Sequence, residues 1–318
     1  DLRERTSTEH MWSARAFLEA KREEQESRHE KFADTEYNLE PNVKSSPGGL
    51  RDLQLIGWLA RRHFGWSSVE ELAENGLLTE EEAQILLRGR EFLWQVRYAL
   101  HTLAGREEDR LLFDHQRALA RQWGFTDDEK LAVEKFMQVY YRWALAIAQL
   151  NELLLQTFDQ AILCTDSEDE VEVINDSFEL RNGYIAARRP DLFSERPGAL
   201  LEVFLLAGSN PAIKGIAAPT IRLIREHRHL VDDEFRADPA NRALFLDILR
   251  CPHRMTRQLR RMSRYGILGK YLPAFGRIVG QMQHDLFHTY TVDAHTLQVV
   301  ENMRRFLRPE SDERFPVT

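Results

Sequence analysis

Two side chains of opposite charge, Glu40 and Lys44, lie four residues apart in a stretch that alternates with period two between residues 35 and 44. The alternation predicts a strand, and Pro41 favours an edge strand or the end of one. Both side chains would then share one face, about 13 Å apart, because a strand rises about 3.3 Å per residue. That separation suits a nucleoside triphosphate, with the carboxylate helping to hold Mg²⁺ and the ammonium meeting phosphate.

A glycine pair, Gly48 and Gly49, follows this stretch, and a helix is predicted over about residues 50–64. A Gly-Gly turn at a helix start exposes backbone N–H groups, which favour anions, and Arg51 adds a cationic donor. The alternative is a polar edge strand and an ordinary tight turn, with Asp52 stabilising the helix N-terminus. The residue types alone favour this alternative, because a glycine pair is a weak signal for a nucleotide.

Histidines and aspartates concentrate between residues 281 and 296, at His284, Asp285, His288, Asp293 and His295. Imidazole and carboxylate groups are metal ligands and acid–base catalysts. A metal site needs about four ligands that converge from several elements, whereas the sequence shows this cluster alone. Histidines that lie at the surface or cap a helix are therefore the alternative to a metal site.

Helices must position these groups, because helical periodicity dominates the chain and predicts a mainly α fold. The longest predicted helix covers about residues 128–162, where apolar residues at three- and four-residue spacing form a core-facing stripe. Asn182-Gly183 predicts a short hairpin over residues 178–187, and the charged run at 21–31 is expected to be solvated. Further helices are predicted at about residues 7–32, 68–75, 79–103, 114–123, 197–207, 217–229, 239–250, 255–264 and 291–307.

Composition excludes several classes of protein. The chain has 43 Lys and Arg against 51 Asp and Glu, a net charge of −8, which argues against a broad basic surface for nucleic acid. Cys164 and Cys251 have no metal-ligand or redox spacing and are expected to be reduced thiols of a cytoplasmic protein. There is no signal peptide, and no apolar run approaches the roughly 20 residues of a membrane span, so no membrane partner is expected.

Two long motifs resemble the bifunctional PII uridylyltransferase/uridylyl-removing enzymes of bacteria. The first begins at Asn38 and reads NLEPNVKSSPGGLRD. The second begins at Val279 and reads VGQMQ, then DLFH, YTVD and HT as far as residue 296. Shorter matches are RLLFDHQ from Arg110 and GILG from Gly266, so the likeness covers nearly the whole chain.

The resemblance implies a definite layout. In this family a polymerase-β-like nucleotidyltransferase domain moves UMP from UTP onto a tyrosine of the PII signalling protein. A helical domain, an HD-type phosphohydrolase domain that removes the UMP, and paired ACT domains that sense glutamine follow in that order. The chain is then expected to hold the end of the first domain at residues 1–48, the helical domain at 49–270 and the start of the HD domain at 271–318. The fold expected from this is a helical bundle with a small β remnant of the nucleotidyltransferase domain and the first HD helix.

The resemblance also assigns roles in the transferase site. Glu40 is expected to be the strand-borne carboxylate that helps to hold the catalytic Mg²⁺ or Mn²⁺, with Glu36 as its rival on the same face. Contacts to the UTP nucleotide are expected from Lys44, Gly48, Gly49 and Arg51.

In the HD-type part, His295 is expected to be the first histidine of the metal site, with His288 and Asp293 as neighbours that support it. The His284-Asp285 pair precedes His295 and is rejected as the His-Asp pair of that domain, which should follow it.

Several parts of the family pattern are absent from the chain, namely the two catalytic aspartates of the transferase, the HD pair and the ACT domains. The chain begins without methionine and is expected to be an internal piece that alone catalyses neither reaction. One alternative is a non-catalytic helical scaffold that docks PII. Another is a related adenylyltransferase acting on glutamine synthetase, which the match at 281–296 disfavours.

Overall fold

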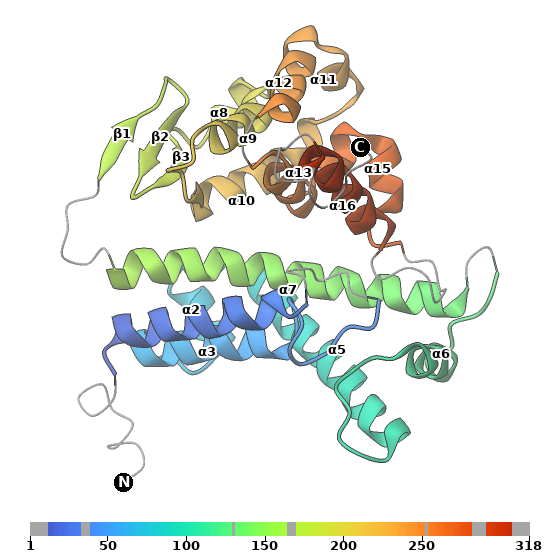
Figure 1. Cartoon of the computed structure of the whole chain (residues 1–318). Coiled ribbons are helices and arrows are strands. Elements are labelled where there is room, and N and C mark those ends of the chain that lie inside the picture. Colours follow the sequence, from blue (N-terminus) through green and yellow to red (C-terminus); the bar gives the residue numbers. More distant parts are fainter. Residues whose placement is uncertain are drawn as a thin grey trace. The chain divides into compact units, whose positions relative to one another are not determined.

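The computed structural model describes residues 12–32, 39–128, 131–163, 170–251, 254–281 and 291–306. The chain divides into two compact units, shown in Figure 1. Unit 1 comprises residues 1–167 and 280–291, and unit 2 comprises residues 168–279 and 292–318. The boundary falls inside the interval expected to be one helical domain, and the expected domain limits remain a prediction.

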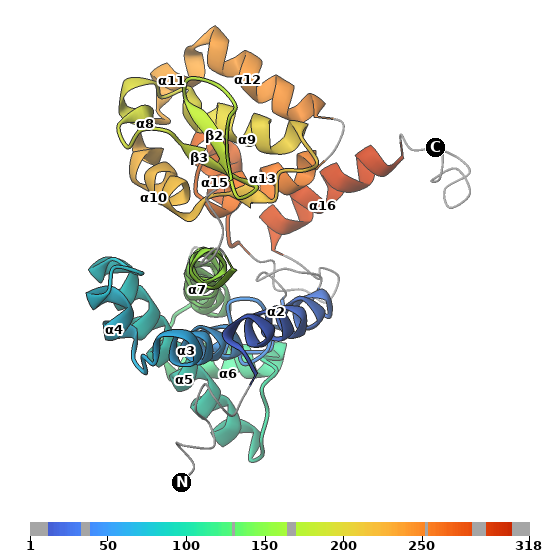
Figure 2. The same ribbon diagram turned by 90° about the vertical axis from the view of Figure 1, so that its left-hand side faces the viewer.

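Unit 1 is built around its longest helix. Its helices are α2 (Ala14–Glu30), α3 (Leu50–Phe64), α4 (Val69–Glu74), α5 (Glu80–Ala104), α6 (Phe113–Gln122) and α7 (Ala132–Leu163). Helices α2, α3, α5 and α6 all contact α7, which Figure 2 shows nearly end-on. The predicted apolar stripe on α7 is buried, for example at Phe136, Tyr140 and Leu154, so its role in the core is confirmed.

Local sequence signals set the ends of these helices. Thr79 accepts a hydrogen bond from the Glu82 N–H, and the Glu82 carboxylate accepts from the Thr79 N–H, which makes the predicted capping box at the start of α5. Gly65 ends α3 in the left-handed conformation, with φ of +79°. Helix α3 begins and ends at the predicted residues.

The strand predicted over residues 35–44 is wrong in its described part, residues 39–44. That part contains turns and a single antiparallel bridge between Asn42 and Arg110. The Asn42 side chain accepts hydrogen bonds from the N–H groups of Lys44 and Ser45, at 3.1 and 2.8 Å. Asparagine turns of this kind compete with extended backbone, so turn chemistry overrides the period-two pattern.

Unit 2 opens with a small sheet of β1 (Val171–Val173), β2 (Phe178–Arg181), β3 (Tyr184–Ala187) and β4 (Gly215–Ile216), in that order. The first three strands are antiparallel, and β4 runs parallel to β3. Asn182 and Gly183 join β2 to β3 with φ of +52° and +85°, so the predicted hairpin is confirmed. The acidic composition of residues 165–176 predicts a loop, and strand β1 shows that this prediction is wrong for residues 171–173.

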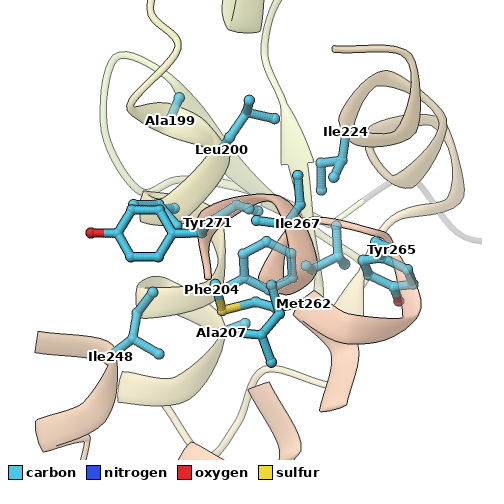
Figure 3. Packing of buried hydrophobic residues seen from close by; sticks show 14 of the residues in the cluster. Ala199, Leu200, Phe204, Ala207, Ile224, Ile248, Met262, Tyr265, Ile267 and Tyr271 are labelled. Carbon is cyan, nitrogen blue, oxygen red and sulfur yellow. The ribbon is translucent and has the colours of Figure 1, made fainter. Parts of the chain in front are cut away.

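Helices form the rest of unit 2: α8 (Leu192–Glu195), α9 (Ala199–Ser209), α10 (Ala218–His227), the 3₁₀ helix η1 (Arg228–Leu230), α11 (Asp233–Ala237), α12 (Pro239–Arg250), α13 (Met255–Arg264), α14 (Leu268–Tyr271), α15 (Pro273–Ile278) and α16 (Val292–Arg305). The core of this unit gathers around α9, whose Phe204 lies among Met262, Ile267 and other apolar side chains (Figure 3). The expected mainly α fold with a small β part is therefore confirmed, but the described strands lie in unit 2 and not in residues 1–48, where the β remnant of the nucleotidyltransferase domain was expected. None of the described helices has the length and apolar character needed to span a membrane.

Candidate functional site

Two sequence motifs that lie far apart in the chain meet in unit 1. We call residues 38–52 the loop motif; its described part begins at residue 39. Asn42 pairs with Arg110, and the Val43 N–H donates to the Asp109 carbonyl at 2.8 Å. Backbone hydrogen bonds therefore join the loop motif to the segment just before α6. The shorter RLLFDHQ motif begins in that segment, at Arg110, and continues into α6. We take this junction as the candidate site.

Glu40 binds the start of α6. Its Oε1 accepts a hydrogen bond from the Phe113 N–H at 3.0 Å, across 73 residues of sequence. Its Oε2 lies 3.7 Å from an Arg110 guanidinium nitrogen. The residue at the N-cap of α6, Leu112, has no side-chain acceptor, so the Glu40 carboxylate supplies the cap and a favourable negative charge. Both oxygens of the predicted metal ligand thus have protein partners.

Lys44 faces the same segment as Glu40. Its ammonium lies 3.9 Å from the Glu107 carboxylate and 3.7 Å from that of Asp109. Asp109 also accepts from Arg97 at 2.6 Å and pairs with His101 at 3.2 Å. Burial acts to raise the pKa of Asp109, but the hydrogen bonds from Arg97 and His101 outweigh it and lower the pKa below its ordinary value. Sequence reasoning missed these partners, although an acidic run precedes the RLLFDHQ motif.

Gly48 and Gly49 are needed for close packing. Gly48 has φ of +74°, and a Cβ there would overlap the backbone carbonyl of Ala144 on α7. A Cβ on Gly49 would lie 2.8 Å from the Ser46 carbonyl oxygen. The N–H of Gly48 donates to Asp52, and that of Gly49 donates to the Ser46 carbonyl, both at 2.8 Å. These two N–H groups, predicted to bind phosphate, therefore have acceptors within the loop motif.

Arg51 lies in the first turn of α3, and its guanidinium carbon is 5.5 Å from the centre of the Trp58 ring. Its backbone N–H donates to the Lys44 carbonyl at 2.8 Å. The structure thus brings Arg51 and Lys44 together through the backbone and stacks the arginine on an aromatic face, where a cation is favoured.

Asp52 is completely buried and binds three side chains of α2. Its Oδ1 accepts from Gln25 at 2.9 Å and Arg28 at 2.7 Å and lies 3.0 Å from His29 Nε2. Burial acts to raise the pKa of Asp52, yet hydrogen bonds and charges from His29, Arg28 and Gln25 lower it. The expectation that the charged run at 21–31 is solvated is therefore wrong for these three residues, which point inward. Asp52 therefore joins α3 to α2, in addition to lying in the first turn of α3.

Two of the predicted HD-type residues, Asp293 and His295, lie on α16 in unit 2. Asp293 is buried in the first turn of that helix, whereas His295 is exposed. Residues two positions apart on a helix point to different sides, so these two side chains do not converge. His288 and Glu36 lie outside the described residues. Within the described ranges, no three or more His, Cys, Asp and Glu residues gather as a metal ion would require, so these residues do not form a complete metal site.

Comparisons with known proteins agree with the division into units. The family model described as "GlnD PII-uridylyltransferase" matches residues 16–155, within unit 1. The model described as "Uridylyltransferase GlnD third domain" matches residues 178–271, within unit 2. No solved structure gives a significant match to the chain.

Curated relatives match over almost the whole chain. Proteins of Pseudomonas aeruginosa (strain LESB58) and Pseudomonas fluorescens (strain SBW25) are each 55% identical over 98% of it. One from Azotobacter vinelandii (strain DJ / ATCC BAA-1303) is 54% identical over 99% of it. All three carry the name bifunctional uridylyltransferase/uridylyl-removing enzyme. The chain spans 35% of the length of each of these relatives.

Proposed function

The chain belongs to the family of GlnD PII-uridylyltransferases, and we propose that it is an internal part of an enzyme that transfers UMP from UTP to a tyrosine of PII and hydrolyses PII-UMP. The observation that carries the proposal is the 55% identity over 98% of the chain to relatives with both activities in their name. The relatives compared favour this function over that of an adenylyltransferase.

Unit 1 would hold the loop motif rigid beside the nucleotide. Three attachments support this role: Gly48 packs on the α7 backbone, Glu40 caps α6, and Asp52 binds α2. A site that must place a triphosphate and an attacking tyrosine in line gains rate from such fixed geometry. The helical unit would thus orient the transferase groups that the loop motif carries.

Lys44 is the residue of the loop motif best placed to meet a phosphate. Its side chain is 31% exposed, and its carboxylate neighbours lie at 3.7 and 3.9 Å, longer than a direct charged hydrogen bond. A phosphate can therefore approach the ammonium without breaking a tight ion pair. Arg51 is proposed as a second contact to the nucleotide, whereas Gly48 and Gly49 would act by shaping the turn.

Glu40 and His295 are proposed ligands of Mg²⁺ or Mn²⁺ in the transferase and HD-type sites respectively. Each would be one member of a set whose other members lie outside the described residues, because the described residues gather no complete set. His288 and Asp293 are proposed to support His295. The same proposal places the glutamine sensor outside this chain and expects a cytoplasmic protein without nucleic-acid or membrane partners.

A second candidate function is a non-catalytic scaffold that docks PII. One observation supports a scaffold function: Glu40, Gly48 and Gly49 have structural roles in the fold. The two functions differ in what they expect of nucleotide binding. A scaffold alone would bind PII without UTP and would be indifferent to the charge of Lys44.

The test is transfer of labelled UMP from UTP to PII in the presence of Mg²⁺. The 318-residue chain is compared with a protein of the relatives' full length that contains it. We expect transfer by the full-length protein alone. Transfer by the 318-residue chain would contradict the proposal, because a complete catalytic centre would then exist within it.

Variants of the full-length protein separate catalysis from scaffolding. Glu40→Gln keeps an oxygen that can accept from the Phe113 N–H but removes the charge that a metal would need. If Glu40 holds a metal, this variant folds and loses transfer; if it only caps α6, the variant keeps transfer. Lys44→Ala is expected to raise the KM for UTP, with Lys135→Ala on α7 as the matched control.

A further inference from the structure

A cavity of about 210 Å³ lies in unit 2 between α13 and α16, which pack side by side (Figure 2). Its lining includes five arginines and one glutamate: Arg254, Arg257, Arg260, Arg304, Arg305 and Glu301. From this cavity we infer that unit 2 carries a binding site for small phosphate-bearing anions. The site is separate from the loop motif, which belongs to unit 1.

The charge of the cavity is opposite to that of the chain. The chain carries a net charge of −8, yet the described residues that line the cavity have a net charge of +4. Like charges held this close repel one another, and a bound anion removes that repulsion. An overall basic composition does not explain the cluster, because the chain is acidic.

Two of the guanidinium groups are held in place by neutral partners. Arg304 donates to the backbone carbonyls of Leu249 and Cys251, each at 2.8 Å. Arg254 donates to the Ile213 carbonyl at 3.0 Å. Carbonyl oxygens orient these cations without cancelling their charge, so the site is organised before an anion arrives.

Glu301 shows which chemistry the cavity accepts. Its carboxylate lies between two guanidiniums, with Arg260 and Arg305 each at 2.7 Å. An arginine fork suits a planar or tetrahedral oxyanion, because it donates parallel hydrogen bonds to two oxygens. A phosphate offers the same acceptors with more charge, and could therefore share or displace these contacts.

The backbone at Arg254 supplies an independent sign of a ligand site. Among the described non-glycine residues, only Asn182 and Arg254 have positive φ, and Asn182 is explained by its hairpin turn. Arg254 sits at the N-cap of the ten-residue α13 with φ of +57° and no side-chain cap. Unfavourable backbone conformations concentrate at binding sites, and the first N–H groups of α13 point to the end that lines the cavity.

The inference does not depend on the proposed function. Arg304 follows His295 by nine residues, which places the two side chains on opposite sides of α16 at about 100° per residue. The concave shape and converging guanidiniums favour a compact anion over the extended acidic surface of a protein. Inorganic phosphate, pyrophosphate and the phosphates of a nucleotide share the required chemistry.

The experiment is calorimetric titration of the 318-residue chain with pyrophosphate, phosphate and UTP at about 0.15 M salt, where only close charge pairs survive screening. We expect pyrophosphate to bind, and the double variant R254Q/R257Q to weaken it about tenfold or more, since each lost charge contact is worth about 1 kcal/mol and 1.4 kcal/mol is tenfold. The matched control R181Q/R189Q removes two exposed arginines elsewhere in unit 2 and should leave the affinity unchanged. Loss of pyrophosphate binding in Lys44→Ala, with binding kept in R254Q/R257Q, would place the anion at the loop motif and would overturn the inference.

Glu301→Gln is expected to raise the affinity for pyrophosphate, a change that a misfolded variant would not show. Removing this carboxylate releases Arg260 and Arg305 and should tighten pyrophosphate binding about two- to fivefold. Tighter binding of UTP than of pyrophosphate, lost in R254Q/R257Q, would identify a nucleotide as the natural source of the phosphate. Equal binding of pyrophosphate and UTP would identify the phosphates alone. The inference is overturned if pyrophosphate does not bind, if R254Q/R257Q binds it like the wild type, or if only an acidic protein binds.

Discussion

Around Asp52, a single buried carboxylate receives hydrogen bonds from Gln25, Arg28 and the Gly48 N–H and pairs with His29. The described lining of the cavity between α13 and α16 contains five arginines and one carboxylate, Glu301, which pairs with Arg260 and Arg305. The first group is closed to solvent at its centre, with Asp52 at 0% exposure. The second is open, with Arg260 and Arg305 about half exposed.

The difference follows from the cost of burying charge. A buried ion survives only when its charge and its hydrogen bonds are compensated, whereas water can support excess charge at a surface. Compensated charge therefore identifies the Asp52 group as part of the fold. Oriented arginines that outnumber the acidic residues among the described lining identify the arginine cavity as available to a ligand.

The largest effect is expected from Gly48→Ala, which would force the Asp52 group apart. The new Cβ would overlap the Ala144 carbonyl, and alanine is disfavoured at φ of +74°. We expect a loss of more than about 4 kcal/mol in the free energy of unfolding of unit 1. Tryptophan fluorescence during urea unfolding reports this unit, because all six tryptophans precede residue 168.

Gly65→Ala is the matched control for that substitution. Gly65 has a similar φ of +79°, but a Cβ there would meet nothing within 4 Å. Only the conformational cost remains, about 1–2 kcal/mol. Equal losses for the two variants would show that the close approach of Gly48 to α7 does not matter.

Asp52→Asn is expected to have the next largest effect. Asparagine keeps the shape but leaves Arg28 and His29 without their buried counter-charge. Breaking a buried ion pair in this way costs about 3–4 kcal/mol, again visible in tryptophan fluorescence. Asp114→Asn, at a side chain that is 90% exposed, should change stability by less than about 0.5 kcal/mol.

The pH dependence of Asp52 sharpens the comparison. Because folding lowers its pKa, the carboxylate stabilises the fold fully above its ordinary pKa of 3.8. That contribution is lost as the pH falls below 3.8 toward the folded pKa. The difference in stability between wild type and Asp52→Asn should therefore narrow below pH 3.8, and a constant difference there would contradict the assignment.

A smaller effect is expected from Arg304→Lys in unit 2. Lysine keeps the charge but cannot reach both the Leu249 and Cys251 carbonyls with the planar fork that arginine uses. The loss of one or two such hydrogen bonds should cost about 1–2 kcal/mol. Far-UV circular dichroism should show the change, while tryptophan fluorescence, confined to unit 1, should not. A shift of the fluorescence transition would mean that the two units unfold together.

The sequence predicted the helices that carry the Asp52 group and the arginine cavity far better than it predicted the contacts between those helices. Helices at 50–64, 239–250 and 255–264 have the predicted bounds, because caps and apolar spacing are local signals. The hairpin at Asn182-Gly183 is local too. The strand prediction is wrong at residues 39–44, and the reason is also local. The Asn42 side chain accepts hydrogen bonds from the N–H groups of Lys44 and Ser45, which makes a turn.

Contacts between distant segments left no such signal. Gln25, Arg28 and His29 belong to a charged run that looks solvated, and only the fold reveals Asp52 opposite them. Glu40 caps a helix 73 residues later. The arginines of the cavity come from two helices, and in each helix alone they resemble ordinary surface charge.

The smallest effect on stability is expected from Glu301→Gln. Its response to salt and to pyrophosphate tests the comparison between the Asp52 group and the arginine cavity. Without an added anion, losing this carboxylate should lower the stability of unit 2 by about 0.5 kcal/mol, because Arg260 and Arg305 then repel each other and the other arginines. Raising the salt concentration to about 1 M, where the screening length is about 3 Å, should erase the difference. Pyrophosphate should stabilise the variant more than the wild type, since it binds the variant more tightly. Asp52→Asn should show neither response, because residue 52 is closed to solvent and therefore to salt and pyrophosphate. If Glu301→Gln were insensitive to both salt and pyrophosphate, the arginine cavity would be structural in the same sense as the Asp52 group, and the contrast between the two regions would no longer hold.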